Sequence, residues 1–214
     1  MSGRRYLRGI MHFKPTTCFF LTLGLALMVL TGPAGWIKTA HSNSASNAPS
    51  VKGTIDRFFK TMGIIKLAGI APPVDIELGD LNGKTIRVSD FKGKIVLLNF
   101  WTTWCPDCRT EMPSMEKLHR HFKDREFVML AINLREPSKR VKSFYEEYKL
   151  SFTTLLDTRG QIGIRFGIRS IPTTFILNQK GGLIGKALGP REWDSEPALA
   201  MFEHLIQNKA EPLF

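Results

Sequence analysis

Runs of apolar residues alternate with segments of helical spacing along residues 71–214 and predict an α/β domain. Lys94–Phe100 and Phe127–Ile132 are nearly continuous apolar runs, as expected for strands covered on both faces of a sheet. Each run is followed by a segment with apolar residues at helical spacing, at 106–123 and 137–148. This alternation predicts a mixed sheet of four or five strands with helices on both faces.

The sequence pattern predicts a β-hairpin at each end of the domain. Val74–Leu78 alternates in strand fashion, an Asn-Gly turn follows, and Lys84–Val88 returns as a second strand. Near the other end, Thr173–Leu177 and Leu183–Leu188 flank a glycine-containing turn, and Glu196–Gln207 is expected to close the domain as a helix. The first of these hairpins is an addition at the N-terminal side of the strand–helix units.

Residues 1–40 have the pattern of an export signal or an N-terminal membrane anchor. Four basic residues precede Cys18–Leu30, an apolar stretch interrupted only by Thr22 and Gly24. This stretch is shorter than the ~20 residues that a membrane span needs, although weaker apolar character continues to Ile37. Cleavage after Ala34 and retention as an anchor both remain open. Either outcome places the rest of the chain outside the cytoplasm.

Residues 41–70 are predicted to be a linker that contains an amphipathic helix. His41–Ser50 is rich in Ser, Asn and Ala, which is typical of a flexible spacer. In Val51–Ile70, apolar residues fall near helical spacing between basic ones. Such a helix either lies on a membrane surface or packs on its own domain, and we favour packing on the domain.

Composition agrees with one globular domain behind a basic N-terminal segment. Apolar residues make up 43% of the 214 residues, charged residues make up 23%, and the formal net charge is +11. Residues 1–50 contain five of the cations and no acid. Because no arginine-rich stripe or interleaving of aromatic and basic residues is present, we expect no nucleic-acid partner.

Cys105 and Cys108 carry the most specific chemical signal in the sequence. They follow a buried strand at the predicted start of a helix, where free N–H groups and the helix dipole favour a thiolate. Residues three apart lie on one helical face, so the two sulfurs can form a disulfide and open it again. The third cysteine, Cys18, lies in the N-terminal apolar stretch, which leaves the domain no structural disulfide framework. The pair therefore predicts redox chemistry.

Three motifs occur in order: VLLNFW at Val96–Trp101, WCPDCRTEMP at Trp104–Pro113 and IPTTF at Ile171–Phe175. With them, residues 71–205 resemble the extracytoplasmic thioredoxin-like thiol–disulfide oxidoreductases of the TlpA/ResA type. The resemblance implies a thioredoxin-like fold and no cofactor other than the Cys105–Cys108 disulfide.

The same resemblance implies a location and partners. The location is the bacterial periplasm or the outer face of the cytoplasmic membrane, reached through the N-terminal segment. The substrate is the thiol or disulfide of an exported protein or apocytochrome, in cytochrome c biogenesis, and a membrane protein donates the electrons.

Three residues are predicted to be catalytic. Cys105 is the outer thiol and the expected nucleophile, and Cys108 is the expected resolving thiol. Asn99 stands where cytoplasmic thioredoxins carry a buried aspartate, and an amide cannot titrate. Glu111 lies three residues after Cys108 on the same helical face, and in the family that the chain resembles a glutamate here is close to the active site. We therefore expect Glu111 to move the proton, the alternative being a solvated helix glutamate.

A substrate-binding rim is predicted around the disulfide. Pro172 resembles the cis-proline that faces the cysteine pair in thioredoxin-like folds. Asp107 lies beside the nucleophile and should disfavour a thiolate there, which makes the disulfide harder to reduce; the alternative is that its side chain points to water and screening leaves little effect. Trp101 is assigned to the rim, although its motif also fits a core position. The predicted rim residues are Trp101, Trp104, Pro106, Asp107, Ile171 and Pro172.

Three other functions compete with the preferred one, which is a reductant of exported proteins. The first is an oxidant that inserts disulfides. The second is a copper or zinc carrier that uses the two thiols, with His119 and His121 as further candidate ligands. Both histidines fall more than a turn beyond Cys108 and no second C-x-x-C exists, so we expect no metal site. The third is a redox-inactive peptide-binding module, which the intact cysteine pair disfavours.

Overall fold

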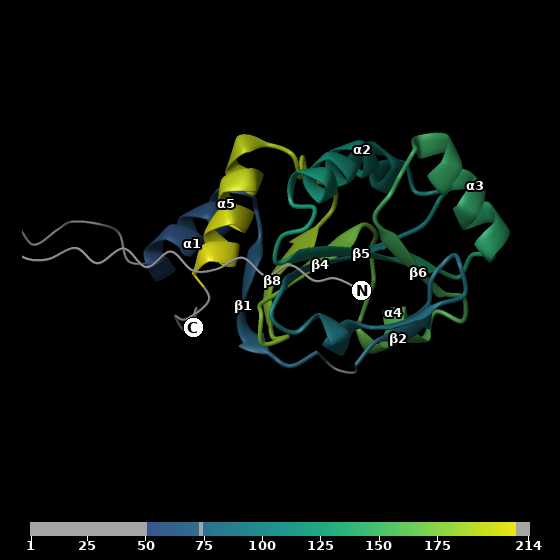
Figure 1. Ribbon diagram of the computed structural model, residues 1–214, viewed down its shortest axis with the longest axis horizontal. Coiled ribbons are helices and arrows are strands. Elements are labelled where there is room, and N and C mark those ends of the chain that lie inside the picture. The colour runs from purple at the N-terminus through teal and green to yellow at the C-terminus, as the bar shows by residue number, and fades with distance from the viewer. Residues whose placement is uncertain (1–50, 73–74, 209–214) are drawn as a thin grey trace, which may run out of the picture. The chain divides into compact units, whose positions relative to one another are not determined.

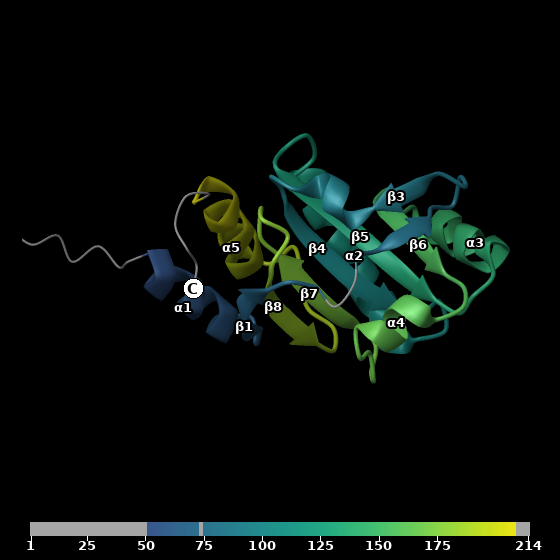
Figure 2. The ribbon, with the colours of Figure 1, turned by 90° about the horizontal axis from the view of Figure 1, so that it is seen from below.

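The computed structural model describes residues 51–72 and 75–208. Its central sheet has six strands in the order β1-β8-β7-β4-β5-β6 (Figure 2). The strands β4, β5 and β6 run parallel, and the strands β4, β7, β8 and β1 pair antiparallel. The strands are β1 (Ile65–Ile70), β4 (Ile95–Trp101), β5 (Phe127–Leu134), β6 (Thr153–Asp157), β7 (Thr173–Leu177) and β8 (Leu183–Leu188). The expected mixed sheet is present, with one strand more than predicted.

Alternate side chains of each strand point to opposite faces of the sheet. Because both faces carry apolar side chains, helices and other elements cover both of them. On one face, Leu97 and Trp101 of β4 join a core with α1 (Val51–Thr61), α2 (Pro106–His121), α3 (Ser138–Tyr148) and α5 (Glu196–Gln207). On the other face, Val96 and Leu98 join a second core with α4 (Gln161–Arg165), η1 (Val88–Phe91) and the hairpin β2 (Glu77–Gly79) and β3 (Thr85–Arg87). Figure 1 shows α2 on one side of the sheet and α4 on the other. The predicted thioredoxin-like arrangement with an added hairpin is confirmed.

The first helix and strand are part of this domain, whereas the sequence analysis placed the domain start at residue 71. Ile55 is fully buried and Phe59 is 2% exposed, and β1 pairs with β8 at the edge of the sheet. The helix can approach β8 because Gly185 has no side chain: a Cβ there would lie 3.2 Å from the Phe59 ring. The partner strand lies more than a hundred residues later, and Ile65 and Ile70 are half-exposed, so the local pattern did not indicate a strand.

The predicted export signal or anchor, residues 1–40, lies outside the described residues, as does Val74, the first residue of the predicted hairpin. Of the helices in the described part of the chain, none is long and apolar enough to cross a membrane.

Candidate active site

Strand β4 and helix α2 place the two cysteines. Cys105 is the N-cap of α2, and Pro106 begins the helix, where its missing N–H leaves no bond unmade. Cys105 and Cys108 form a disulfide with their Cα atoms 5.3 Å apart. The backbone N–H of Cys108 donates to the Cys105 Sγ at 3.1 Å. A free N–H and the positive helix end favour a thiolate at Cys105 when the disulfide opens.

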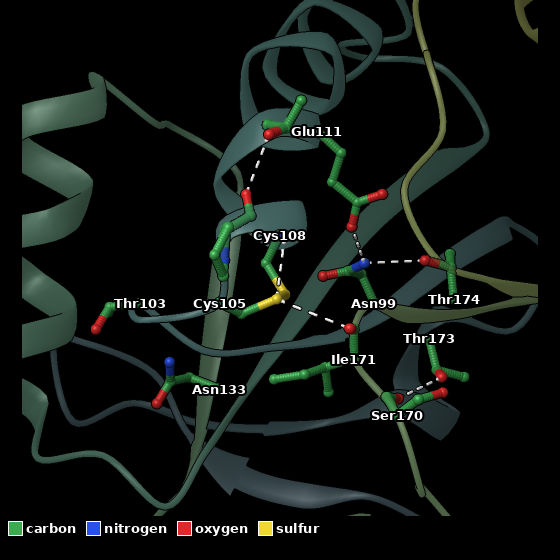
Figure 3. The surroundings of a disulfide bond; sticks show 12 residues. Asn99, Thr103, Cys105, Cys108, Glu111, Asn133, Ser170, Ile171, Thr173 and Thr174 are labelled. Carbon is green, nitrogen blue, oxygen red and sulfur yellow. Dashed lines mark hydrogen bonds between the residues drawn. A yellow bond between two sulfur atoms is a disulfide. The ribbon is translucent and has the colours of Figure 1, made fainter.

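Figure 3 shows the cis-proline loop facing this disulfide. The Ile171–Pro172 peptide bond is cis, as the resemblance implies, and the Ile171 carbonyl oxygen lies 3.8 Å from the Cys105 Sγ. The Thr173 hydroxyl donates to the Ser170 carbonyl at 2.7 Å, and this bond closes the loop across the Ile171–Pro172 cis bond. The loop therefore presents a backbone acceptor beside the predicted nucleophile.

Of the two tryptophans assigned to the rim, only one reaches the surface. Trp104 is 64% exposed and, with Ile171 and the exposed Ile164, lines a hollow of about 260 Å³. Trp101 is fully buried, and its ring packs 5.0 Å from that of Phe144. The assignment of Trp101 to a substrate rim is therefore wrong, because its side chain points into the core under α3. Pro106 and Asp107 are both exposed on the first turn of α2.

Glu111 is buried, with 2% exposure, so the alternative of a solvated helix glutamate does not hold. Its Oε1 accepts from Asn99 Nδ2 at 2.8 Å, and its Oε2 accepts from Trp193 Nε1 at 3.1 Å and from the Arg191 backbone N–H at 3.3 Å. Burial raises the pKa of Glu111 to about 7 despite these three bonds, which favour the carboxylate. The side chain can therefore both accept and donate a proton near neutral pH.

Asn99 connects this carboxyl group to the sheet. It lies on β4, is fully buried, and donates both to Glu111 Oε1 and to Thr174 Oγ1, at 2.8 and 2.9 Å. The bonds from Glu111 therefore lead through a carboxamide, which cannot titrate, to the strand β7. The Thr174 contact depends on the antiparallel pairing of β4 with β7.

Sequence reasoning missed Arg191 and Trp193, which supply donors to Glu111. The Arg191 guanidinium donates to the carbonyls of Met62 at 2.8 Å and Gly63 at 3.0 Å, and so fastens its own loop to the turn after α1. That loop carries the indole of Trp193 to the carboxylate. Both residues follow Glu111 by eighty positions or more, and no local pattern indicates such a contact.

Sequence reasoning also missed Glu136, which holds the loop before Cys105. It is 4% exposed and accepts from the Thr103 backbone N–H at 2.7 Å and from the Thr103 hydroxyl at 2.6 Å. The Asn133 amide donates to it at 2.7 Å. These bonds tie the segment between β4 and α2 to the end of β5 and restrict where the first cysteine lies.

The histidines considered as metal ligands lie elsewhere on α2. The His119 ring contacts Phe152, and the His121 ring contacts Phe122. Within residues 51–72 and 75–208, no three His, Cys, Asp or Glu side chains gather as a group that could hold a metal ion.

Comparisons with known proteins agree with this geometry. Residues 70–185 match the model of the AhpC/TSA family. The thiol-disulfide oxidoreductase ResA of Halalkalibacterium halodurans is 40% identical over 137 residues, which cover 64% of this chain and 76% of the relative. ResA of Bacillus subtilis is 39% identical over 112 residues, covering 52% of this chain and 63% of that relative.

Solved structures show the same similarity. StoA from Bacillus subtilis superposes with a TM-score of 0.50 at 30% identity, over 56% of this chain and 91% of that one. The thioredoxin domain of a thiol-disulfide oxidoreductase from Bacteroides vulgatus gives a TM-score of 0.57 at 25% identity, over 65% and 99%. With the disulfide at the start of α2 and the cis-proline loop facing it, the chain belongs to the AhpC/TSA family and is a thioredoxin-like thiol–disulfide oxidoreductase of the ResA type.

Proposed function

We propose that this oxidoreductase works outside the cytoplasm as a reductant of disulfides in exported proteins, including apocytochrome c during cytochrome c maturation. The proposal rests mainly on two groups near the Cys105–Cys108 disulfide. The Ile171 carbonyl oxygen lies beside the Cys105 sulfur, and the buried carboxyl group of Glu111 lies one helical turn beyond Cys108. The basic and apolar N-terminal segment supports export or anchoring.

The reaction consists of two exchanges. The Cys105 thiolate attacks one sulfur of the substrate disulfide, a mixed disulfide forms, and the second substrate sulfur leaves as a thiolate that takes up a proton. Cys108 then loses its proton and attacks the Cys105 sulfur, which closes the Cys105–Cys108 disulfide and releases the first substrate sulfur. Two electrons pass to the substrate, and a membrane electron donor returns the pair to the dithiol form.

The groups near the sulfurs support the direction of transfer. The Ile171 carbonyl oxygen is 3.8 Å from the Cys105 Sγ, and Glu111, one helical turn beyond Cys108, is partly ionised near pH 7 because burial raises its pKa to about 7. The negative charge and the carbonyl oxygen oppose the stabilisation that the start of α2 gives to a thiolate, and so make the reduced form less stable than the helix start alone would. A disulfide whose reduced form is less stabilised is harder to reduce, and its dithiol is a stronger reductant.

Glu111 is the proposed proton acceptor in the second exchange. Cys108 must become a thiolate to attack, and it is fully buried, so bulk water does not reach its sulfur directly. The Glu111 carboxyl group lies one helical turn away and accepts a hydrogen bond from Asn99, which Figure 3 shows beside the disulfide. A carboxyl group with a pKa of about 7 is suited to take this proton and release it again at neutral pH.

The substrate is proposed to bind across the exposed surface around Cys105. Trp104 offers an exposed indole, and the adjoining hollow with Ile164 and Ile171 can take an apolar side chain that flanks the substrate cysteine. Pro106 and Asp107 border the same surface from the first turn of α2. The oxidant alternative uses the same surface and differs only in the direction of electron transfer.

Thiol alkylation in cells separates these directions. In a strain that lacks this protein, exported apocytochrome should accumulate with its cysteine pair as a disulfide, and expression of the full-length chain should restore the dithiol. Expression of the Cys105→Ser chain at the same level is the matched control and should not restore it. Accumulation of free thiols in the strain without the protein would contradict the proposal and indicate an oxidant.

A further inference from the structure

Asn99 is held in one orientation by its neighbours. Both hydrogens of its Nδ2 are used, one by Glu111 Oε1 at 2.8 Å and one by Thr174 Oγ1 at 2.9 Å. A carboxamide rotated by 180° would place its oxygen against the carboxylate. The two bonds therefore fix the position of the carboxamide oxygen, Oδ1.

This oxygen is buried and has no hydrogen-bond partner among the described residues. Figure 3 shows it on the side of the carboxamide that faces the Cys105–Cys108 sulfurs. Buried acceptors are nearly always paired in folded proteins, so an orphaned one beside a reactive group calls for a donor. In the oxidised state the two sulfurs carry no hydrogen and cannot supply it.

We propose that Asn99 Oδ1 accepts a hydrogen bond from the Cys108 thiol when the disulfide is reduced. Reduction adds two electrons and two protons, breaks the S–S bond and gives two S–H groups. In the disulfide state the Cys108 sulfur is buried under the first turns of α2, where the free carboxamide oxygen faces it. An S–H group is a weak donor, and an amide oxygen is an acceptor that it can use.

The bond has two consequences for the exchange reaction, whichever way electrons flow. It favours the protonated form of Cys108, so the bond must break when Cys108 loses its proton and attacks the Cys105 sulfur of the mixed disulfide in the second exchange. It also favours the dithiol over the disulfide. A net hydrogen bond corresponds to about a fivefold shift of that equilibrium, which is small beside the ~10⁵-fold difference between protein reductants and strong oxidases.

Infrared spectroscopy of the S–H stretch tests the bond directly. In the Cys105→Ser chain, Cys108 is a permanent thiol, and its S–H band should lie at a lower frequency than in the Cys105→Ser, Asn99→Leu chain. The band of Cys18 is common to both spectra and cancels in the difference. An unchanged Cys108 band would overturn the proposal.

Asn133→Leu is the control for loss of a buried asparagine with an unpaired Oδ1; because it also removes a donor to Glu136, it is read by the Cys108 band and not by activity. Figure 3 shows its oxygen turned away from the sulfurs, so this substitution should leave the Cys108 band in place. Asn99→Asp keeps an acceptor oxygen and should retain the low frequency even if Asn99→Leu fails to fold.

The redox equilibrium of the unblocked pair gives an independent readout. Against glutathione, Asn99→Leu should shift the pair about fivefold toward the disulfide, and Asn133→Leu should not shift it in that direction. A shift of Asn99→Leu toward the dithiol would contradict the proposal. Because this comparison is between variants, its outcome does not depend on whether the protein serves as a reductant in cells.

Discussion

Replacing Cys105 by Ser should abolish disulfide reductase activity, by ~10³-fold or more, because the nucleophile of the first exchange is lost. Replacing Cys108 by Ser should leave the first exchange intact and remove the second. The variant should then accumulate a covalent mixed disulfide between Cys105 and the substrate. Cys105 is the N-cap of α2 and keeps slight exposure, whereas Cys108 has none, which gives the two thiols these different roles.

The measurement is non-reducing electrophoresis with mass spectrometry, after mixing each reduced variant with an oxidised model peptide. Cys18→Ser is the control and should behave like the unaltered chain, because the redox-active disulfide joins Cys105 and Cys108 and does not include Cys18. If adducts formed on Cys108 in the Cys105→Ser variant instead, the two roles would be reversed.

Replacing Glu111 by Gln should slow the second exchange by ~10²-fold, because a proton acceptor near Cys108 is removed while its shape is retained. The sign of the pH effect follows from the pKa of about 7. As the pH rises from about 6 to 8, Glu111 becomes ionised and able to accept the proton, so this step should accelerate in the unaltered chain through that range. The variant should lack the component that titrates near pH 7. Stopped-flow reduction of a model disulfide measures both effects.

Glu116→Gln is a matched control on the same helix. Glu116 is also buried, but it bonds to Ser151 and Arg120 rather than to the residues around the disulfide. Its replacement should lower stability and leave the pH dependence of the rate in place. Identical pH–rate profiles for Glu111→Gln and the unaltered chain would show that solvent alone moves the proton.

Stability should also respond to the replacement of Glu111, since the side chain is buried. Its folded pKa of about 7 lies above the ordinary 4.5, so the folded state binds this proton more tightly than the unfolded state. The free energy of unfolding of the unaltered chain should therefore fall by ~3 kcal/mol as the pH rises from about 4.5 to 7. The Gln variant lacks this contribution. The difference in free energy of unfolding between the unaltered chain and the variant should therefore change by ~3 kcal/mol over the same pH range.

The sequence was sufficient for the redox pair and for most of the fold because those signals are local. The apolar run before Cys105, the proline at the helix start and the IPTTF motif each determine structure within a few residues. The place of Glu111 on the cysteine face of α2 also follows from helical spacing. Its burial does not, because that depends on Trp193 and on a loop fastened by Arg191.

The interpretations that failed depended on distant contacts. Trp101 ends a strand next to the motif, and only the packing of α3 shows that its ring lies in the core. The strand β1 is recognisable only through its pairing with β8, which follows it by more than a hundred residues. In both cases the local pattern suits two environments, and tertiary packing selects one of them.

The reduction potential of the Cys105–Cys108 couple tests the proposed direction of electron transfer most directly. It is obtained by equilibrating the full-length chain in glutathione and dithiothreitol buffers and quantifying the dithiol fraction after acid quenching. A reductant of exported proteins should have a potential below about −200 mV, well under that of a periplasmic oxidant. A potential of about −120 mV, which is typical of a strong disulfide oxidase, would contradict the account and favour a function as a disulfide-forming oxidant.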